Sequence, residues 1–396
     1  MSQPIEIKKG IYWVGVVDWT VRSFHGHTYS TPRGTTYNAY LIVDDKIALV
    51  DTVFAAFGSE MMAKIRGIVD PAKIDYVIAN HVETDHSGAL PQLLKLCPKA
   101  KVFGTQKCQE GLYKYYYCDL NFQIVKTGDT LKLGKRTLTF IEAPMVHWPD
   151  SMFTYCREEE LLLPNDAFGQ HYASSQRFND QVDNCELMDE AKKYYANILW
   201  PLGSMISRKI EEVLKLNLPV SMIAPSHGII WRKDPLEIVK AYQGWARQET
   251  VAKVIVVYET MWNSTQKMAR LITDELIAGG LEVKLYDVNN ADRTDIFKEM
   301  LDAKGFLFGS STHDNNMLPN LAGFLALLKG FKAKGRVAGV FGSYGWAAGA
   351  VKEIEELLKA AGIEVAVNSC SAKFVPDDKE SADCLRFAAD FAAKVK

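Results

Sequence analysis

Short apolar runs alternate with amphipathic stretches over the last third of the chain. The runs that predict strands are 253–259, 281–287, 305–309 and 336–341. The stretches with apolar residues at helical spacing are 265–278, 318–328, 347–361 and 381–394. Strands that alternate with helices form parallel sheets, because each helix leads the chain back to begin another strand in the same direction. The pattern therefore predicts a three-layer α/β domain over residues 251–396.

The first 250 residues have a different pattern. Many short strand-like runs, among them 37–43, 46–50 and 137–142, are interspersed with only a few helical stretches. This mixture predicts an αβ sandwich built on mixed sheets. The amphipathic segment 234–252 is the expected junction, so we expect one domain at 1–250 and a second at 251–396.

Length, charge and cysteine content narrow the possible functions. A chain of 396 residues with 46 Lys and Arg against 48 Asp and Glu has a net charge of −2, which excludes the basic surface that nucleic acid binding requires. The first residues lack an apolar signal segment and no long apolar run follows, so we expect a cytoplasmic protein without a membrane span. The seven Cys never form a C-x-x-C pair, which argues against an iron–sulfur or rubredoxin-type centre.

Candidate metal ligands follow several of the apolar runs in the first domain. They are His81, Glu83, Asp85, His86, His147, Asp166 and His227. Polar groups at strand ends gather at one edge of an α/β layer, so we expect a single site. Imidazoles and carboxylates without a thiolate favour a redox metal such as iron over structural zinc, and the set is too large for one ion. We therefore expect two metals, with Asp166 able to bridge them. His25, His27, His171 and His313 are expected to be structural or to lie around the site.

Three polar loops follow predicted strands of the second domain. The first contains Thr260, Met261, Trp262, Asn263, Ser264 and Thr265, the second Ser310, Ser311, Thr312 and Asn315, and the third Ser343, Tyr344, Gly345 and Trp346. Hydroxyls and backbone N–H groups at a helix N-terminus bind phosphate. The first loop lacks both the G-K-[ST] ending of a P-loop and the G-x-G-x-x-G of dinucleotide sites. A flavin mononucleotide fits this pattern, with aromatic residues beside its ring.

These two modules, in this order, resemble the flavodiiron proteins, also called A-type flavoproteins, across the whole chain. The HVETDH at 81–86 is similar to the HxHxDH motif of metallo-β-lactamases with Glu83 in place of the second His, and the TMWNST at 260–265 is similar to the family's FMN-phosphate loop. The resemblance implies an N-terminal metallo-β-lactamase-like αβ/βα sandwich and a C-terminal flavodoxin-like, doubly wound parallel sheet. It also implies FMN and two non-haem iron ions as cofactors.

The resemblance further implies a role for each candidate ligand. One iron would be held by His81, Glu83 and His147, the other by Asp85, His86 and His227, with Asp166 between them. No catalytic residue is implied beyond the ligands. Family members differ in whether the residue at the His86 position binds iron, and many have Pro where this chain has Ser311. The minimal two-domain type is implied, with no rubredoxin or flavin reductase domain after Lys396.

The implied function is reduction of O2 to water, of NO to N2O, or of both gases. Electrons would come from a separate carrier, rubredoxin or a reduced deazaflavin, and the chain would form a head-to-tail homodimer or a tetramer built from it. The preference between gases depends on groups around the iron pair, among which we consider His25, Trp148 and Tyr195. One alternative is a zinc-dependent hydrolase with a flavodoxin-like docking domain, which Glu83 argues against. Another is an electron carrier with a structural metal.

Overall fold

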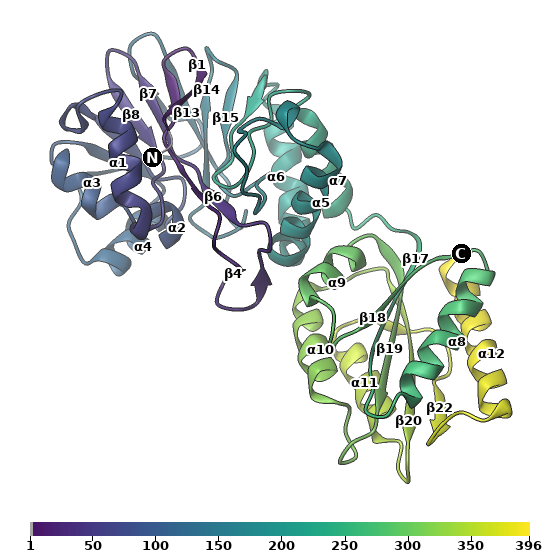
Figure 1. The fold of residues 1–396 in the computed structure, drawn as a ribbon. Coiled ribbons are helices and arrows are strands. Elements are labelled where there is room, and N and C mark those ends of the chain that lie inside the picture. Colours follow the sequence, from purple (N-terminus) through teal and green to yellow (C-terminus); the bar gives the residue numbers. More distant parts are fainter. Residues whose placement is uncertain (1–2) are drawn as a thin grey trace. The chain divides into compact units, whose positions relative to one another are not determined.

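The computed structural model describes residues 3–396, which group into two compact units (Figure 1). The first unit takes in the chain as far as Tyr194 together with Ser204–Gln243, and the second takes in Tyr195–Gly203 and Gly244–Lys396. The chain therefore passes between the units three times, where the sequence indicates one junction. Among the helices of residues 3–396, none is both long and apolar enough to cross a membrane.

The first unit is a sandwich of two mixed sheets. Within the described residues, the larger sheet has the order β1 (Ile5–Lys8), β2 (Ile11–Trp13), β7 (Tyr40–Val43), β8 (Ile47–Val50), β9 (Tyr76–Ile78), β10 (Lys101–Gly104) and β11 (Phe122–Ile124). The smaller has the order β12 (Thr130–Lys132), β13 (Thr137–Glu142), β14 (Met152–Cys156), β15 (Leu161–Leu163) and β16 (Met222–Ile223). Buried side chains from both sheets, such as Trp13 and Phe140, form one core between them.

Helices cover the outer faces of this sandwich (Figure 1). Those of the larger sheet are α1 (Gly58–Arg66), α2 (Thr84–Ser87), α3 (Leu90–Leu96) and α4 (Gln106–Tyr116); those of the smaller are α5 (Asn184–Tyr194), α6 (Gly203–Lys215) and α7 (Leu236–Ala246). Short 3-10 turns lie at η1 (Ala55–Phe57), η2 (Pro71–Lys73) and η3 (Asn179–Gln181). Two small ribbons pair β3 (Val16–Asp18) with β6 (Thr35–Tyr37) and β4 (Ser23–Phe24) with β5 (Tyr29–Ser30).

The run at 37–43, predicted as one strand, is divided between β6 and β7. The break falls at Asn38, whose backbone N–H donates to Ser226 O at 2.7 Å instead of joining a sheet ladder. Its buried side chain accepts from Trp13 Nε1 at 2.7 Å and donates to Pro225 O at 2.8 Å and Gly228 O at 3.1 Å. These tertiary hydrogen bonds outweigh the local preference for a continuous strand.

The second unit is a parallel sheet with helices on both faces. Its order is β18 (Glu282–Asp287), β17 (Val251–Glu259), β19 (Ala303–Ser311), β20 (Val337–Tyr344) and then β21 (Glu364–Val365) and β22 (Cys370–Lys373). The helices are α8 (Ser264–Ala278), α9 (Arg293–Met300), α10 (Pro319–Phe331), α11 (Gly349–Ala360) and α12 (Asp378–Val395). The first strand, β17, lies between β18 and β19, so the winding direction reverses there. Ligands bind at the carboxyl ends of the strands at such a reversal.

The segment Tyr195–Gly203 packs with this second unit although it lies far ahead of β17. It forms a π-helical turn η4 (Tyr195–Leu199) and a 3-10 turn η5 (Trp200–Leu202). The buried ring of Trp200 stacks on Phe331, with centroids 5.4 Å apart, and the guanidinium of Arg336 lies 5.4 Å from the Trp200 ring. The core of the second unit thus includes a residue from the segment between α5 and α6 of the first unit.

Candidate metal centre and flavin site

The seven candidate metal ligands all follow strands of the first unit. His81 and Glu83 lie just after β9, and the short helix α2 carries Asp85 and His86. His147 lies in the loop between β13 and β14, Asp166 follows β15 and His227 follows β16. All but Glu83 are buried, so these strand ends deliver a compact set of nitrogen and oxygen atoms into the protein interior.

The first group consists of His81, Glu83, His147 and Asp166, with one ligating atom of each within 4.8 Å of the others. The Nε2 atoms of His81 and His147 lie 3.4 and 3.5 Å from Glu83 Oε2. The same nitrogens lie 3.7 and 3.4 Å from Asp166 Oδ2. Two imidazoles and two carboxylates therefore face one point.

The second group consists of Asp85, His86 and His227. The Nε2 atoms of His86 and His227 lie 3.4 and 3.0 Å from Asp85 Oδ2. They lie 3.0 and 3.6 Å from Asp166 Oδ1. Asp166 thus presents Oδ2 to the first group and Oδ1 to the second, which is the arrangement of a carboxylate that bridges two cations.

The separations between these atoms fit metal ligation. Two ligands about 2.1 Å from the same ion lie about 3.0–3.4 Å apart in octahedral or tetrahedral geometry, and the nitrogen–oxygen distances above fall in or close to this range. Asp85 Oδ1 and Asp166 Oδ2 are buried and accept no hydrogen bond from the described residues. Buried carboxylate oxygens without donors require a cation nearby. The donor set therefore suits two divalent metal ions.

Burial and neighbouring carboxylates act on the imidazoles in opposite directions. Burial would lower the pKa of His86, but the charges of Asp166 and Asp85 raise that pKa to about 9. Burial is likewise outweighed at His81, whose pKa is raised well above its ordinary value by hydrogen bonds to Asp150 and Glu83. Burial would raise the pKa of Asp166, but the positive charges of His86 and His147 hold that pKa well below its usual range. Metal ions that bind here must therefore displace protons from the imidazoles.

Several residues that contact the ligands are not evident from the sequence. Asp166 Oδ1 accepts hydrogen bonds from the hydroxyls of Tyr194 and Ser226, both at 3.1 Å. The Nδ1 of His227 donates to Thr36 O at 2.6 Å, and that of His81 lies 2.9 Å from Asp150 Oδ2. Each of these partners is far in sequence from the ligand that it contacts and follows no motif. Ser226 alone could have been suspected from the sequence, because it is adjacent to the candidate ligand His227.

Of the residues considered for the surroundings of the metals, two contact ligands. His25 Nε2 lies 3.4 Å from Glu83 Oε1, and the ring of Trp148 meets that of His81 edge-on at 5.0 Å. The third, Tyr195, belongs to the second unit, and it is Tyr194 that reaches Asp166.

Two further histidines have different surroundings. His171 is buried with its ring 4.9 Å from that of His227, and burial lowers its pKa well below the ordinary value, so it is neutral. His313, in the second unit, lines the cavity described next.

A cavity of about 600 Å³ lies at the carboxyl ends of the strands in the second unit. The predicted residues that line it are Met261, Trp262, Ser264, Ser311, Thr312, Asn315, Ser343, Tyr344, Gly345 and Trp346. The cavity is of the size that small cofactors occupy. Its rim is apolar and open to solvent, since Trp262 and Trp346 are 82% and 93% exposed.

Four predicted flavin-site residues support the cavity or lie beside it. Thr265 is buried, and its hydroxyl lies 2.9 Å from Ser311 Oγ and 2.8 Å from Ser343 Oγ. Ser310 Oγ accepts from Leu318 N at 2.9 Å. Asn263, with φ of 64°, begins α8 beside a smaller neighbouring cavity. Thr260 has a buried hydroxyl without a hydrogen-bond partner among residues 3–396.

Ser311, which occupies the position where Pro is frequent in the family, takes part in this hydroxyl network. Besides Thr265, its Oγ accepts from Met261 N at 3.3 Å. The serine thus joins the first and second loops through a side chain that Pro does not have.

Phe374 and Val375 also line the cavity, although neither was predicted from the sequence. They follow β22, a strand that the apolar pattern did not predict because only alternate residues of Cys370–Lys373 are buried. The exposed apolar pair directly after this strand was the available signal.

Two family models match the chain in the order of its units. The ODP family beta lactamase model matches residues 35–228 and the flavodoxin model matches residues 256–387. A nitric oxide reductase of Moorella thermoacetica is 54% identical over 397 residues, with all of both chains covered. An anaerobic nitric oxide reductase flavorubredoxin of Aeromonas hydrophila is 44% identical over 96% of this chain and 77% of its own.

Solved structures agree with these relatives. The rubredoxin oxygen:oxidoreductase of Desulfovibrio gigas superposes with a TM-score of 0.97 at 38% identity, over 99% of this chain and 98% of its own. The flavodiiron protein of Giardia intestinalis superposes with a TM-score of 0.94 at 35% identity, over 100% and 97%. The chain belongs to the flavodiiron protein family. The expected fold, a metallo-β-lactamase-like sandwich followed by a flavodoxin-like sheet, is confirmed in this flavodiiron chain.

Proposed function

We propose that this flavodiiron protein is an oxidoreductase that reduces nitric oxide, dioxygen or both at a pair of iron ions, with electrons that arrive through FMN. The proposal is carried by Asp166, whose two carboxylate oxygens face separate groups of imidazole and carboxylate ligands. It is supported by the relatives, which are named as nitric oxide reductases and as a rubredoxin oxygen:oxidoreductase.

The first iron would be held by His81, Glu83 and His147, the second by Asp85, His86 and His227, with Asp166 shared. His86 is included because its Nε2 converges with those of the other histidines. Two ferrous ions and a reduced flavin together supply four electrons, enough to take O2 to water, whereas coupling of two NO to N2O needs two. The role of the protein is to hold this set rigidly in a buried site, with Tyr194 and Ser226 orienting Asp166.

FMN would bind in the cavity of the second unit. The first backbone N–H groups of α8 and the hydroxyl of Ser264 would hold its phosphate, because a helix N-terminus attracts anions. The rings of Trp346, Tyr344 and Phe374 would lie beside the isoalloxazine. We assign the metal site to residues 1–250 and the flavin site to 251–396, with the segment 195–203 belonging to the second unit.

We further propose a head-to-tail homodimer, in which the flavin of one chain serves the metals of the other. The exposed rim around the flavin cavity supports this arrangement, since Trp262, Trp346 and Phe374 form a solvent-exposed apolar surface of the kind that partners cover. Rubredoxin is the proposed electron donor, with a reduced deazaflavin as the other carrier to test.

The proposal is tested with anaerobically purified protein checked for iron and FMN content. Consumption of NO and of O2 is followed at electrodes after addition of reduced rubredoxin or reduced deazaflavin. Consumption of either gas, dependent on one carrier, is the expected result. Two zinc ions per chain with ester or amide hydrolysis would support the hydrolase alternative instead, and FMN cycling without gas consumption would support a simple electron carrier.

A further inference from the structure

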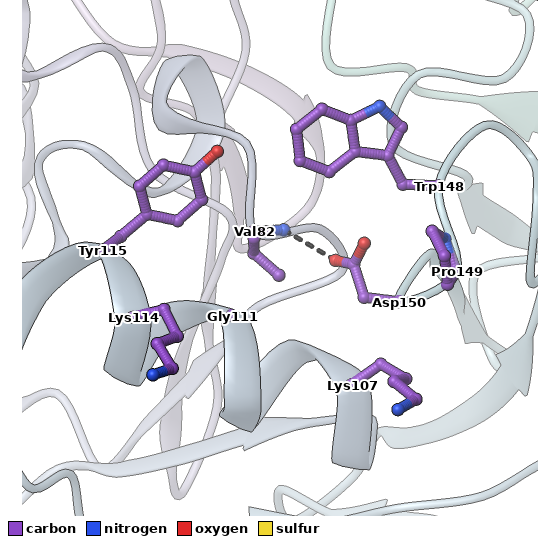
Figure 2. A pocket seen from close by; sticks show the side chains of 8 residues that line it. All are labelled: Val82, Lys107, Gly111, Lys114, Tyr115, Trp148, Pro149 and Asp150. Atoms are coloured by element: carbon purple, nitrogen blue, oxygen red, sulfur yellow. Dashed lines mark hydrogen bonds between the residues drawn. The ribbon is translucent and has the colours of Figure 1, made fainter.

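Asp150 is a buried carboxylate directly behind a metal ligand and outside both ligand groups. It is 4% exposed and lies in the loop that also carries His147. Figure 2 shows it on the wall of a cavity of about 300 Å³, between Val82 and Pro149 and near the ring of Trp148. Its Oδ2 lies 2.9 Å from His81 Nδ1 and accepts the Val82 N–H at 2.8 Å. One oxygen atom thus holds both the ring of the ligand and the backbone that follows it.

The position of Asp150 is fixed from the opposite side as well. Its backbone carbonyl accepts from Thr105 Oγ1 at 3.0 Å. Thr105 is the N-cap of α4 and its hydroxyl also accepts the Cys108 N–H at 3.1 Å. The backbone of Asp150 is therefore held by the N-cap residue of α4, through a contact that does not involve any metal ligand.

The other histidines of the site have weaker support at Nδ1. His227 donates from Nδ1 to a backbone carbonyl, that of Thr36, and the Nδ1 of His86 is buried without a hydrogen-bond partner in the part of the chain that the structure describes. Only His81, among the four, has a carboxylate at Nδ1 in residues 3–396. A carboxylate at Nδ1 leaves Nε2 free for the metal and increases the donor strength of the ring.

We propose that Asp150 is a positioning residue that directs Nε2 of His81 to the first metal and sets the affinity of that metal independently of the second. The inference rests on the proposed ligand groups. If Asp150 served only to stabilise the loop, its hydrogen bond from the Val82 N–H would be enough for that role. The hydrogen bond to His81 would then have no effect on metal binding.

The test is titration of metal-free, full-length protein with Co²⁺, followed by absorbance. Wild type is expected to bind two equivalents tightly. Asp150→Asn keeps an oxygen acceptor but removes the charge, so one equivalent should bind about 10–100-fold more weakly and the other as in wild type. Asp150→Ala removes the acceptor as well and should weaken the same equivalent further. FMN content and thermal unfolding of the metal-free variants establish that they are folded.

Asp44→Asn is the matched control. The Asp44 side chain is 3% exposed and accepts backbone N–H groups of Asp45, Lys135 and Arg136, away from the ligands. It should bind both equivalents as wild type does.

Two outcomes for the variants would overturn the role of Asp150: unchanged binding of both equivalents in Asp150→Asn and Asp150→Ala, or equal weakening of both. Failure of wild type to bind two equivalents would instead overturn the ligand groups themselves.

A second readout does not depend on affinity. In protein loaded with Zn²⁺, which is diamagnetic, the Nδ1–H protons of His81 and His227 should both be visible by NMR in ¹⁵N-histidine-labelled protein, because each is buried and hydrogen-bonded. The His81 proton should be lost in Asp150→Ala and the His227 proton retained. Retention of both would contradict the proposal.

Discussion

The carboxyl group of Asp166 is the residue-scale feature on which the whole metal centre depends. Its two oxygens contact different imidazoles, and it is held by hydroxyls of Tyr194 and Ser226. Both hydroxyls donate to Oδ1 and so fix the orientation of the carboxylate. A carboxylate placed in this way determines how many ions the site retains.

Replacement of Asp166 by Ala should therefore reduce bound iron from two per chain to one or fewer while FMN content stays unchanged, since Asp166 belongs to the first unit and the residues that line the flavin cavity all belong to the second. Iron is measured by elemental analysis and FMN by absorbance after release. Asp44→Ala is the control, because it removes a buried carboxylate that touches no ligand. Retention of two irons in Asp166→Ala would contradict the bridging role.

Asn38 provides a separate prediction about stability. It is fully buried and satisfies Trp13 Nε1 and the carbonyls of Pro225 and Gly228. Asn38→Ala leaves these groups without partners and should lower the free energy of unfolding by about 2–3 kcal/mol. Chemical denaturation of the metal-free protein measures this change. The control is Asn121→Ala at an exposed position, which should change the free energy of unfolding by less than about 0.5 kcal/mol. An equal change in both variants would contradict the role given to the buried Asn38.

The sequence indicates the candidate ligands but not the residues that support them. Each candidate ligand follows an apolar run, so the local sequence is enough to predict that it lies at the end of a strand. Asp150 and Tyr194, by contrast, are separated from the residues they contact by 69 and 28 positions. The packing of loops from different sheets determines which carboxylate or phenol contacts a ligand. No local sequence pattern predicts this packing.

At the scale of elements, the strongly periodic segments were predicted well. The stretch at 265–278 is α8 and the run at 305–309 lies within β19. In the second unit, the elements not predicted were α9, β21, β22 and the turns η4 and η5. Both strands are short edge elements that bury few residues, so neither produces an apolar run. Parallel pairing with β20, which is a tertiary interaction, determines their place.

The N-terminus of α8 gives a prediction for the flavin site. Thr265→Val keeps the shape of the side chain but removes the hydroxyl that joins Ser311 and Ser343. Loss of about 1–2 kcal/mol from these hydrogen bonds should weaken FMN binding about 5–30-fold. Fluorescence of FMN titrated with flavin-free protein measures the affinity.

The matched control lies on the same helix. Thr273 is also buried, and its hydroxyl has no hydrogen-bond partner in the described chain. Thr273→Val should therefore leave FMN affinity as in wild type. Equal weakening in both variants would mean that the helix rather than the hydroxyl network was affected.

At the scale of the whole molecule, the proposed dimer predicts complementation between two inactive chains. Asp166→Ala should lack a complete pair of metal ions, and Ser264→Asp places a negative charge where the flavin phosphate would bind. Neither should reduce NO or O2 alone. Co-expressed, they should recover about a quarter of wild-type activity, since half of randomly mixed dimers hold one chain of each kind and each of these has one complete flavin–metal pair.

The control for this experiment starts from the two variants purified separately and then mixed. Their subunits are exchanged only afterwards, by unfolding and refolding the mixture. Activity should be absent before that treatment and present after it. Activity that never appears in mixed dimers would mean that electrons pass between the flavin and the metals of one chain, and the head-to-tail arrangement would be wrong.

The path of the chain through Tyr195–Gly203 limits how such proteins can evolve. A gene segment that encoded only residues 251–396 would leave Trp200 behind and expose the faces of Phe331 and Arg336 that it covers. Recombination at a single point therefore cannot transfer the whole second unit without also moving residues 204–243 of the first. An engineered exchange of the second unit alone must move two separate stretches of sequence together.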